Sequence, residues 1–150
     1  MNMLITKELI DLKMTQSSKE EVVKALAEKA KELGRVSDLG TYVEAVMHRE
    51  SEYSTAVGFG VAIPHGKTNA VAEAFLAYGR VDGVDWQALD DEPVYNVFLI
   101  GVPEEASGNT HLQILAKLSR KLMKKEFRAA LNDADSSENL LELLKENEIM

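Results

Sequence analysis

Apolar residues recur at helical spacing in two segments of the N-terminal third of the chain. Ser18 is followed three residues later by a glutamate, the capping-box pattern in which two side chains satisfy backbone groups at a helix N-terminus. The apolar residues that follow lie on one face of a helix that we expect to end at Gly34, and they are Val22, Val23, Leu26, Ala27, Ala30 and Leu33. A second helix is predicted from an Asp38 cap to Glu50 or Ser51.

Runs of alternating or continuous apolar residues predict the strands. A weak alternation indicates a short strand within residues 9–12, and the apolar run 61–63 fits a buried strand. Residues 73–81 alternate, and this strand is expected to end at an Asp-Gly turn at 82–83. The most continuous apolar run, 94–102, is typical of a buried central strand.

Helical periodicity returns in the last third of the chain. Thr110 begins a second capping-box pattern, which places His111 in the first turn of a helix whose apolar side faces the core. Residues 127–131 continue helical, and residues 135–138 cap a last, leucine-rich helix. The order is thus strand, two helices, three strands and then helices. This order predicts an α/β protein, a sheet covered by helices with some strands parallel.

Composition narrows the class of protein. A chain of 150 residues has the commonest size of a single domain, so we expect one domain over residues 1–150. The formal net charge of −8 argues against a nucleic-acid partner, because nucleic-acid phosphates need a basic patch. There is no cysteine, and we find neither a membrane-spanning stretch nor a signal peptide, so we expect a cytoplasmic protein.

One stretch is a candidate for chemistry, the sequence GFGVAIPHGK at 58–67. Its apolar run is cut off by Pro64, which lacks a backbone N–H and fixes its own φ. His65 follows, and then Gly66, which can adopt backbone angles that other residues avoid. A strand that ends in this way can present an imidazole, which is largely neutral near pH 7 and has a lone pair for nucleophilic attack. A strand end that merely contains a histidine is an equally good interpretation.

Two more residues at the ends of predicted elements are candidates. Arg49 lies at the C-terminal end of the second helix, close in sequence to His65, and a cation there also complements the helix dipole. His111 lies at a helix N-terminus, which tends to keep an imidazole neutral and favours a bound anion. A structural arginine and an exposed first-turn histidine are the plainer interpretations of these residues taken alone.

Three pieces of the chain closely resemble the phosphorylation-site signature of the fructose/mannitol-type (type 2) EIIA domain of the bacterial phosphoenolpyruvate-dependent sugar phosphotransferase system: Arg-Glu at 49–50, Ser-Thr at 54–55 and Gly-Phe-Gly-Val-Ala-Ile-Pro-His-Gly at 58–66. The later Thr-His-Leu at 110–112 is similar to the second histidine motif of that family. The resemblance covers essentially the whole chain. It implies a three-layer α/β/α sandwich with a mixed β-sheet.

The resemblance also implies a function. His65 would accept a phosphoryl group from phosphorylated HPr, with Arg49 and His111 beside it. It would then pass the group to a cysteine of an EIIB unit for sugar uptake, with fructose as the first expectation. Contact with the membrane would be indirect, through an EIIC unit, and the transfer would use no cofactor and no metal. Transport specificity resembles a property of other units, so the sugar stays open.

Three alternatives stay open at this point. A relative of the nitrogen-type EIIA would accept phosphate and then act by binding other proteins. A sensor module would act in the same way as part of a transcription regulator. A zinc site made of His48, His65 and His111 is the third alternative, because three neutral imidazoles can ligate zinc.

Overall fold

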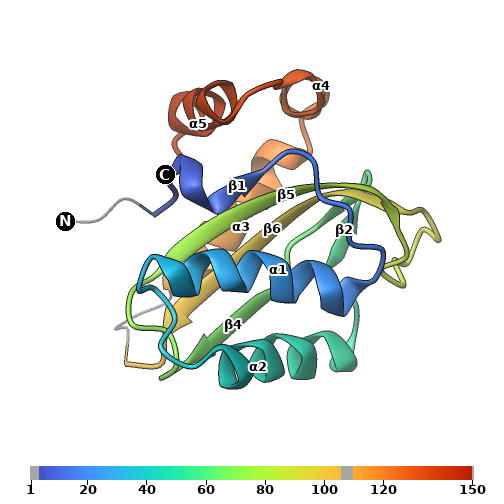
Figure 1. Cartoon of the computed structure of the whole chain (residues 1–150). Coiled ribbons are helices and arrows are strands. Elements are labelled where there is room, and N and C mark those ends of the chain that lie inside the picture. The colour runs from blue at the N-terminus through green and yellow to red at the C-terminus, as the bar shows by residue number, and fades with distance from the viewer. Residues whose placement is uncertain (1–3, 106–109, 150) are drawn as a thin grey trace.

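The computed structural model describes residues 4–105 and 110–149, apart from the side chains of Thr110 and His111. Figure 1 shows how the elements are arranged. None of the helices in these ranges has the combined length and apolar character that a membrane crossing requires. In chain order the elements are the 3-10 helix η1 (Lys7–Leu9), strand β1 (Ile10–Asp11), helices α1 (Lys19–Glu32) and α2 (Leu39–Glu52), strands β2 (Ala56–Gly58), β3 (Val61–Ala62), β4 (His65–Thr68), β5 (Phe75–Val84) and β6 (Val94–Pro103), and helices α3 (Thr110–Leu122), α4 (Lys125–Asp133) and α5 (Ser137–Glu146).

A mixed sheet lies between layers of helices. Within the described residues it has six strands, in the order β1-β5-β6-β3-β2, and β4 also pairs with β6. The long strands β5 and β6 are antiparallel, whereas β1 is parallel to β5, and β3 and β4 are parallel to β6. Helices α1 and α2 cover one face of the sheet, and α3 lies against the other (Figure 1). Helix α4 contacts β5 through Arg80 and β6 through Asn96, and α5 contacts η1. The predicted three-layer α/β/α sandwich with a mixed sheet is therefore confirmed.

The core lies on both sides of the β5–β6 pair. Strand β6 is buried throughout residues 96–102, and within the pair Tyr78 lies opposite Phe98. On the α2 side, the ring of Tyr42 packs against that of Phe75, with the ring centres 5.6 Å apart. Because β6 is covered on both faces, nearly every residue along it is apolar, as predicted for a buried central strand.

Side-chain caps begin the helices where the sequence predicted them. Ser18 accepts a hydrogen bond from the backbone N–H of Glu21 at 3.2 Å, and Asp38 accepts one from the N–H of Thr41 at 3.1 Å. The predicted first and second helices are therefore confirmed, the second extending slightly beyond its predicted end. Ser136 caps α5 in the same way, which confirms the last helix.

The observed strands differ from the predicted strands in two places. Positive φ angles at 58–60 turn the chain into a hairpin that contains β2, and the chain pairs again with β6 as β4 after the interruption at Pro64. The prediction that the Asp-Gly pair at 82–83 ends a strand is wrong. Strand β5 continues to Val84, because Gly83, with a φ of 69°, allows an irregularity in the pairing at this point.

Candidate functional site

His65 is the first residue of β4, at the point where pairing with β6 resumes. In β3, Ala62 pairs with Val97, and in β4, His65 pairs with Ile100. Between these pairs, the Pro64 carbonyl accepts a hydrogen bond from the Ile100 N–H at 3.0 Å. Strands β3 and β4 therefore follow one line along β6, and the candidate nucleophile lies directly after the interruption.

Gly66 shows which face of the sheet the His65 side chain occupies. A Cβ atom at Gly66 would lie 3.0 Å from Val46 Cγ2 and 3.3 Å from Tyr42 Cε1, both on α2. Successive side chains of a strand point to opposite faces, so His65 points away from α2, toward the face that α3 covers (Figure 1). The expectation of a special backbone angle at Gly66 is wrong, since its φ is not positive; close packing of α2 requires the glycine instead.

The imidazole of His65 is held in one orientation. Its Nδ1 lies 3.0 Å from the backbone carbonyl oxygen of Ile63. A carbonyl oxygen can only accept, so Nδ1 carries the proton of this hydrogen bond, and the neutral ring then has its lone pair on Nε2. The residue is half-buried. Fixed orientation, a defined proton position and partial exposure suit a nucleophile that attacks through Nε2.

Arg49 lies in the last turn of α2, as predicted. Its Nη1 donates a hydrogen bond to the backbone carbonyl of Tyr53 at 2.9 Å, and its guanidinium lies 4.5 Å from the centre of the Tyr53 ring. A cation at this position complements the helix dipole, in agreement with the structural interpretation of Arg49. Both contacts belong to the end of α2, so the place of Arg49 beside His65 stays a prediction.

His111 lies in the first turn of α3, which confirms its predicted helical position. Its side chain, and the Thr110 side chain of the predicted capping box, lie outside the described residues. Helix α3 covers the face toward which His65 points, so the two histidine positions belong to the same side of the sheet. A contact between their side chains stays a prediction.

The third histidine, His48, is exposed on α2. Among the side chains that the structure describes, no three His, Asp or Glu residues gather in an arrangement that could hold a metal ion. The His111 side chain is not among those described. The zinc alternative of the sequence analysis is therefore untested.

Sequence reasoning missed a buried carboxylate at the end of α2. Glu50 is 5% exposed. Its carboxylate has four partners: the Thr55 hydroxyl, the Thr55 N–H at 3.2 Å, the Trp86 indole N–H at 3.2 Å and the Lys19 ammonium at 3.3 Å. These partners come from α1, from the segment before β2 and from the segment after β5. An acid four residues after Val46, on the buried side of a helix, was the signal that could have revealed it.

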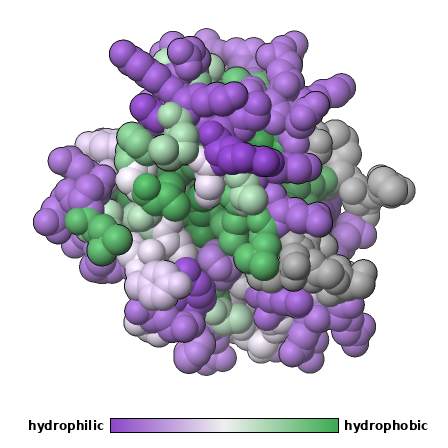
Figure 2. All heavy atoms as spheres, turned by 180° about the vertical axis from the view of Figure 1, so that it is seen from behind, coloured by the Kyte–Doolittle hydropathy of each residue, from purple (hydrophilic) through white to green (hydrophobic). Residues whose placement is uncertain are grey.

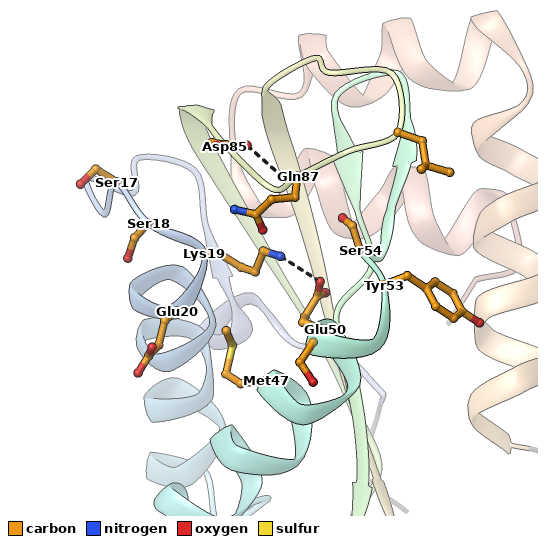
Figure 3. A pocket seen from close by; sticks show the side chains of 12 residues that line it. Ser17, Ser18, Lys19, Glu20, Met47, Glu50, Tyr53, Ser54, Asp85 and Gln87 are labelled. Atoms are coloured by element: carbon orange, nitrogen blue, oxygen red, sulfur yellow. Dashed lines mark hydrogen bonds and ion pairs between the residues drawn. The ribbon is translucent and has the colours of Figure 1, made fainter.

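An open hollow of about 870 Å³ lies beside this carboxylate, between the start of α1, the end of α2 and the segment after β5. Figure 3 shows Lys19 and Glu50 pointing toward each other at its wall. His65 is not among the residues that line the hollow. The candidate nucleophile and this hollow therefore belong to different parts of the surface.

Exposed apolar side chains lie on the hairpin between β2 and β3 and on α3. Val57 and Phe59 of the hairpin are 47% and 53% exposed, and Leu112 of α3 is 50% exposed. Figure 2 shows the face that α3 covers, where apolar side chains gather near the middle of a largely hydrophilic surface. Arg128 of α4 lies 3.9 Å from the centre of the Phe59 ring, which joins the hairpin to the helices of this face. Such apolar areas are typical of protein docking surfaces.

Comparison with known proteins supports the family resemblance that the sequence motif indicated. Residues 3–147 match the family described as the phosphoenolpyruvate-dependent sugar phosphotransferase system, EIIA 2. The chain is 41% identical over 140 residues to a PTS system fructose-specific EIIA component from Haloferax volcanii, a match that covers 93% of this chain and 90% of that protein. It is 38% identical over 146 residues to a PTS system fructose-specific EIIABC component from Bacillus subtilis, covering 97% of this chain but 23% of the relative.

A solved structure shares the fold. Nitrogen regulatory protein IIA-Ntr from Neisseria meningitidis superimposes with a TM-score of 0.86 at 31% identity, over 94% of this chain and 96% of that one. The family match extends over nearly the whole chain, including the strands that hold His65. The chain therefore belongs to the type 2 EIIA family of the phosphoenolpyruvate-dependent sugar phosphotransferase system.

Proposed function

We propose that this chain is a phosphoryl carrier whose acceptor atom is Nε2 of His65. The observation that carries the proposal is the hydrogen bond from Nδ1 to the Ile63 carbonyl, which leaves the Nε2 lone pair for attack on phosphorus. The donor is phosphorylated HPr, and the receiver is a cysteine of an EIIB unit, in sugar uptake of the fructose type. The carrier works in the cytoplasm and meets the membrane only through an EIIC unit.

The phosphoryl group can be transferred while the ring proton of His65 stays on Nδ1. Nε2 of His65 attacks the phosphorus of the donor phosphohistidine, a new P–N bond forms, and the old P–N bond returns its electron pair to the donor imidazole. The attacking nitrogen carries no proton, so no general base is required. In the second step a cysteine thiolate of EIIB attacks the phosphorus, and His65 leaves as a neutral imidazole with its proton still on Nδ1.

Arg49 and His111 support the group in transfer. Negative charge spreads over the phosphoryl oxygens, so positioning and electrostatic stabilisation supply most of the catalysis. Arg49 offers forked donors that match phosphoryl oxygens, and it exchanges its contacts with Tyr53 to reach them. His111 lies in the first turn of α3, where the helix N-terminus favours a neutral ring that donates one more hydrogen bond.

The surface of the β2–β3 hairpin and α3 is suited to binding another protein. The exposed Val57, Phe59 and Leu112 side chains lose water when another protein covers them, and such burial contributes to association. The Bacillus subtilis relative is an EIIABC component, which supports an EIIB unit as the receiver for the present chain. Docking of a partner also keeps water from the phosphohistidine during transfer.

Labelling by a purified donor system tests the proposal. With enzyme I, HPr and radioactive phosphoenolpyruvate, we expect His65→Ala to abolish labelling while circular dichroism stays unchanged. The matched control is His48→Ala, which removes an exposed histidine on α2 and should label like the wild type. Labelling of a well-folded His65→Ala protein would contradict the carrier proposal.

A regulatory role is the second candidate, favoured by the close superposition on nitrogen regulatory protein IIA-Ntr. In that role the phosphorylation state of His65 controls binding to another protein, in a free-standing regulator or in a sensor module. Discharge of the labelled chain separates the two roles. Rapid loss of label to an EIIB unit supports the sugar carrier, whereas label that no EIIB unit accepts supports the regulator.

A further inference from the structure

A line of hydrogen bonds runs through the backbone from Glu50 to His65. The Glu50 carboxylate accepts from the Thr55 N–H at 3.2 Å. The Thr55 carbonyl accepts from the Ile63 N–H at 3.1 Å, and the Ile63 carbonyl accepts from Nδ1 of His65 at 3.0 Å. Each residue of this line is bound to the next, from the end of α2 to the imidazole.

Glu50 is the fixed end of the line. Its side chain is 2% exposed, and that of its ion-pair partner Lys19 is 12% exposed. Lys19 binds Oε2, the same oxygen that accepts from the Thr55 N–H, whereas the Trp86 indole binds Oε1. Figure 3 shows the Lys19 and Glu50 side chains meeting between α1 and α2. A shift of this carboxylate would leave a buried donor unsatisfied, which is costly.

The position of Ile63 depends on its hydrogen bond to Thr55, because Ile63 lies where the sheet is interrupted. Strand β3 ends at Ala62, and Pro64 has no N–H to pair. The bond to Thr55 therefore helps to determine where the Ile63 carbonyl lies, and that carbonyl orients the ring of His65. The N–H and the C=O of one residue belong to different peptide groups, so the line transmits position and no proton moves along it.

We propose that Glu50 is a positioning residue for His65. It holds Thr55, and through Ile63 the imidazole, in the Nδ1–H form that directs Nε2 at the phosphoryl group. This inference rests on the proposed transfer to His65. A displacement of about 1 Å in a reacting group can lower a rate about 10²-fold, so loss of this line has a measurable effect on transfer.

Glu50→Gln cuts the first link with little change in shape. The amide oxygen can still accept from Trp86 and from the Thr55 hydroxyl, but the amide nitrogen cannot accept from the Thr55 N–H. Nitrogen-15 NMR of the His65 ring reports which nitrogen carries the proton. We expect the variant to lose part of the Nδ1–H form and to transfer at least about tenfold more slowly at saturating phospho-HPr. The matched control Glu52→Gln, at an exposed position of α2, should change neither quantity.

Trp86→Phe separates positioning from general stability. It removes the donor to Oε1 and leaves the Oε2 link to Thr55, so we expect a lower melting temperature with an unchanged His65 ring. If Glu50→Gln does not fold, Lys19→Met is the second variant, because Lys19 shares Oε2 with Thr55. It is expected to shift the ring signals in the same direction by a smaller amount. An unchanged His65 ring in whichever of these two variants folds overturns the proposal.

The ring signals and the rate of transfer distinguish failure of the proposed function from failure of the positioning proposal. If the wild-type chain takes no phosphoryl group from phospho-HPr, the proposed function fails, while the ring signals still test the link from Glu50 to His65. A shifted ring together with an unchanged rate of transfer overturns the positioning role.

Discussion

At the scale of single residues, the two nitrogens of the His65 imidazole have different surroundings. Nδ1 is bound to the Ile63 carbonyl, and this bond orients the ring and leaves the lone pair on Nε2. Arg49 is held against Tyr53, at the end of the helix that packs on the same strand. In the proposed transfer, His65 supplies a nucleophile of fixed orientation. Arg49 supplies a positive charge that contacts the phosphoryl group when that group arrives.

Replacement of Arg49 should slow transfer more than replacement of any neutral donor. A charge-assisted hydrogen bond in a dry site is worth roughly 10²-fold in rate, so we expect Arg49→Ala to lower the rate of transfer from phospho-HPr by about that factor. Arg49→Lys should restore only part of the loss, because lysine lacks the planar fork. Rapid-quench labelling measures the rates, and circular dichroism checks the fold. A lysine variant as fast as the wild type would contradict the forked contact.

His111 is expected to act as a neutral donor. Neutral hydrogen bonds are roughly half as strong as charged ones, so His111→Ala should cost less than Arg49→Ala. His111→Gln keeps an N–H donor and should retain more activity than His111→Ala. The same labelling assay compares the variants. If His111→Gln were as inactive as His65→Ala, His111 would have to transfer a proton or accept the phosphoryl group itself.

At the scale of elements, α2 supports the site along its whole length. Asp38 caps its first turn, Val46 packs on Gly66 of β4 in its middle, and Glu50 binds Thr55 at its end. The close approach in the middle requires the absence of a side chain at position 66. The position of β4, and with it His65, therefore depends on how closely α2 packs on the strand.

Gly66→Ala should destabilise the fold by steric crowding. The added Cβ would lie 3.0 Å from Val46 Cγ2, so α2 must move or Val46 must leave its place. Overpacking of this kind typically costs about 1–3 kcal/mol, measured by urea denaturation, and Val46→Ala in the same chain should recover part of it. Gly40→Ala is the control, since its Cβ would only reach Asp38 Oδ1 at 3.7 Å. Equal stability of Gly66→Ala and the wild type would contradict the close packing.

Asp38 should stabilise α2 in a pH-dependent way. Its hydrogen bond from the Thr41 backbone N–H lowers the pKa of Asp38 below the ordinary value of 3.8. A lowered pKa in the folded state means that this stabilisation is full above pH 3.8 and is lost as the pH falls through the folded-state pKa. Asp38→Ala should therefore lower the urea midpoint at pH 7, and its difference from wild type should shrink in acid. Ser136→Ala, at a cap where an uncharged hydroxyl accepts from the Asn139 N–H, should show a difference independent of pH.

At the scale of the whole molecule, buried polar contacts join the sheet to α4. The Tyr78 hydroxyl donates to Asn96 Oδ1, and Asn96 Nδ2 donates to Asn132 Oδ1 at 3.1 Å. Arg80 donates to two backbone carbonyls at the end of α4, each at 2.8 Å. Burial raises the pKa of Tyr78 above its ordinary value, so the hydroxyl stays protonated and remains a donor. These contacts connect the central strands with the C-terminal helices.

Tyr78→Phe should destabilise the whole domain. It removes the donor to Asn96, which is 3% exposed, and leaves a buried acceptor without its partner. An unsatisfied buried group costs about 1–3 kcal/mol, so the free energy of unfolding should fall by that amount in urea denaturation. Replacing Asn96 by Leu in the Tyr78→Phe chain should not double the loss, because the two residues share one network. Fully additive losses would contradict the coupling.

Elements whose signals are local were predictable from the amino-acid sequence. The helix caps at Ser18, Asp38 and Ser136, and the apolar run of β6, follow from spacing along a short segment of chain. The motif around His65 was also readable, and the family resemblance that it carried is confirmed. Local spacing is sufficient for these features because helix periodicity, capping and continuous burial involve residues within a few positions of one another.

The surroundings of His65 depend on the fold and were not predictable from the sequence. The face to which the imidazole points, the reason for Gly66 and the four partners of Glu50 all depend on which strands pair and in which register. Gly83, taken from its sequence as the end of a strand, lies inside β5 because the pairing with β6 continues beyond it. Pairing and register join residues that are far apart along the chain, and a shift of one residue would turn every side chain of a strand to the other face.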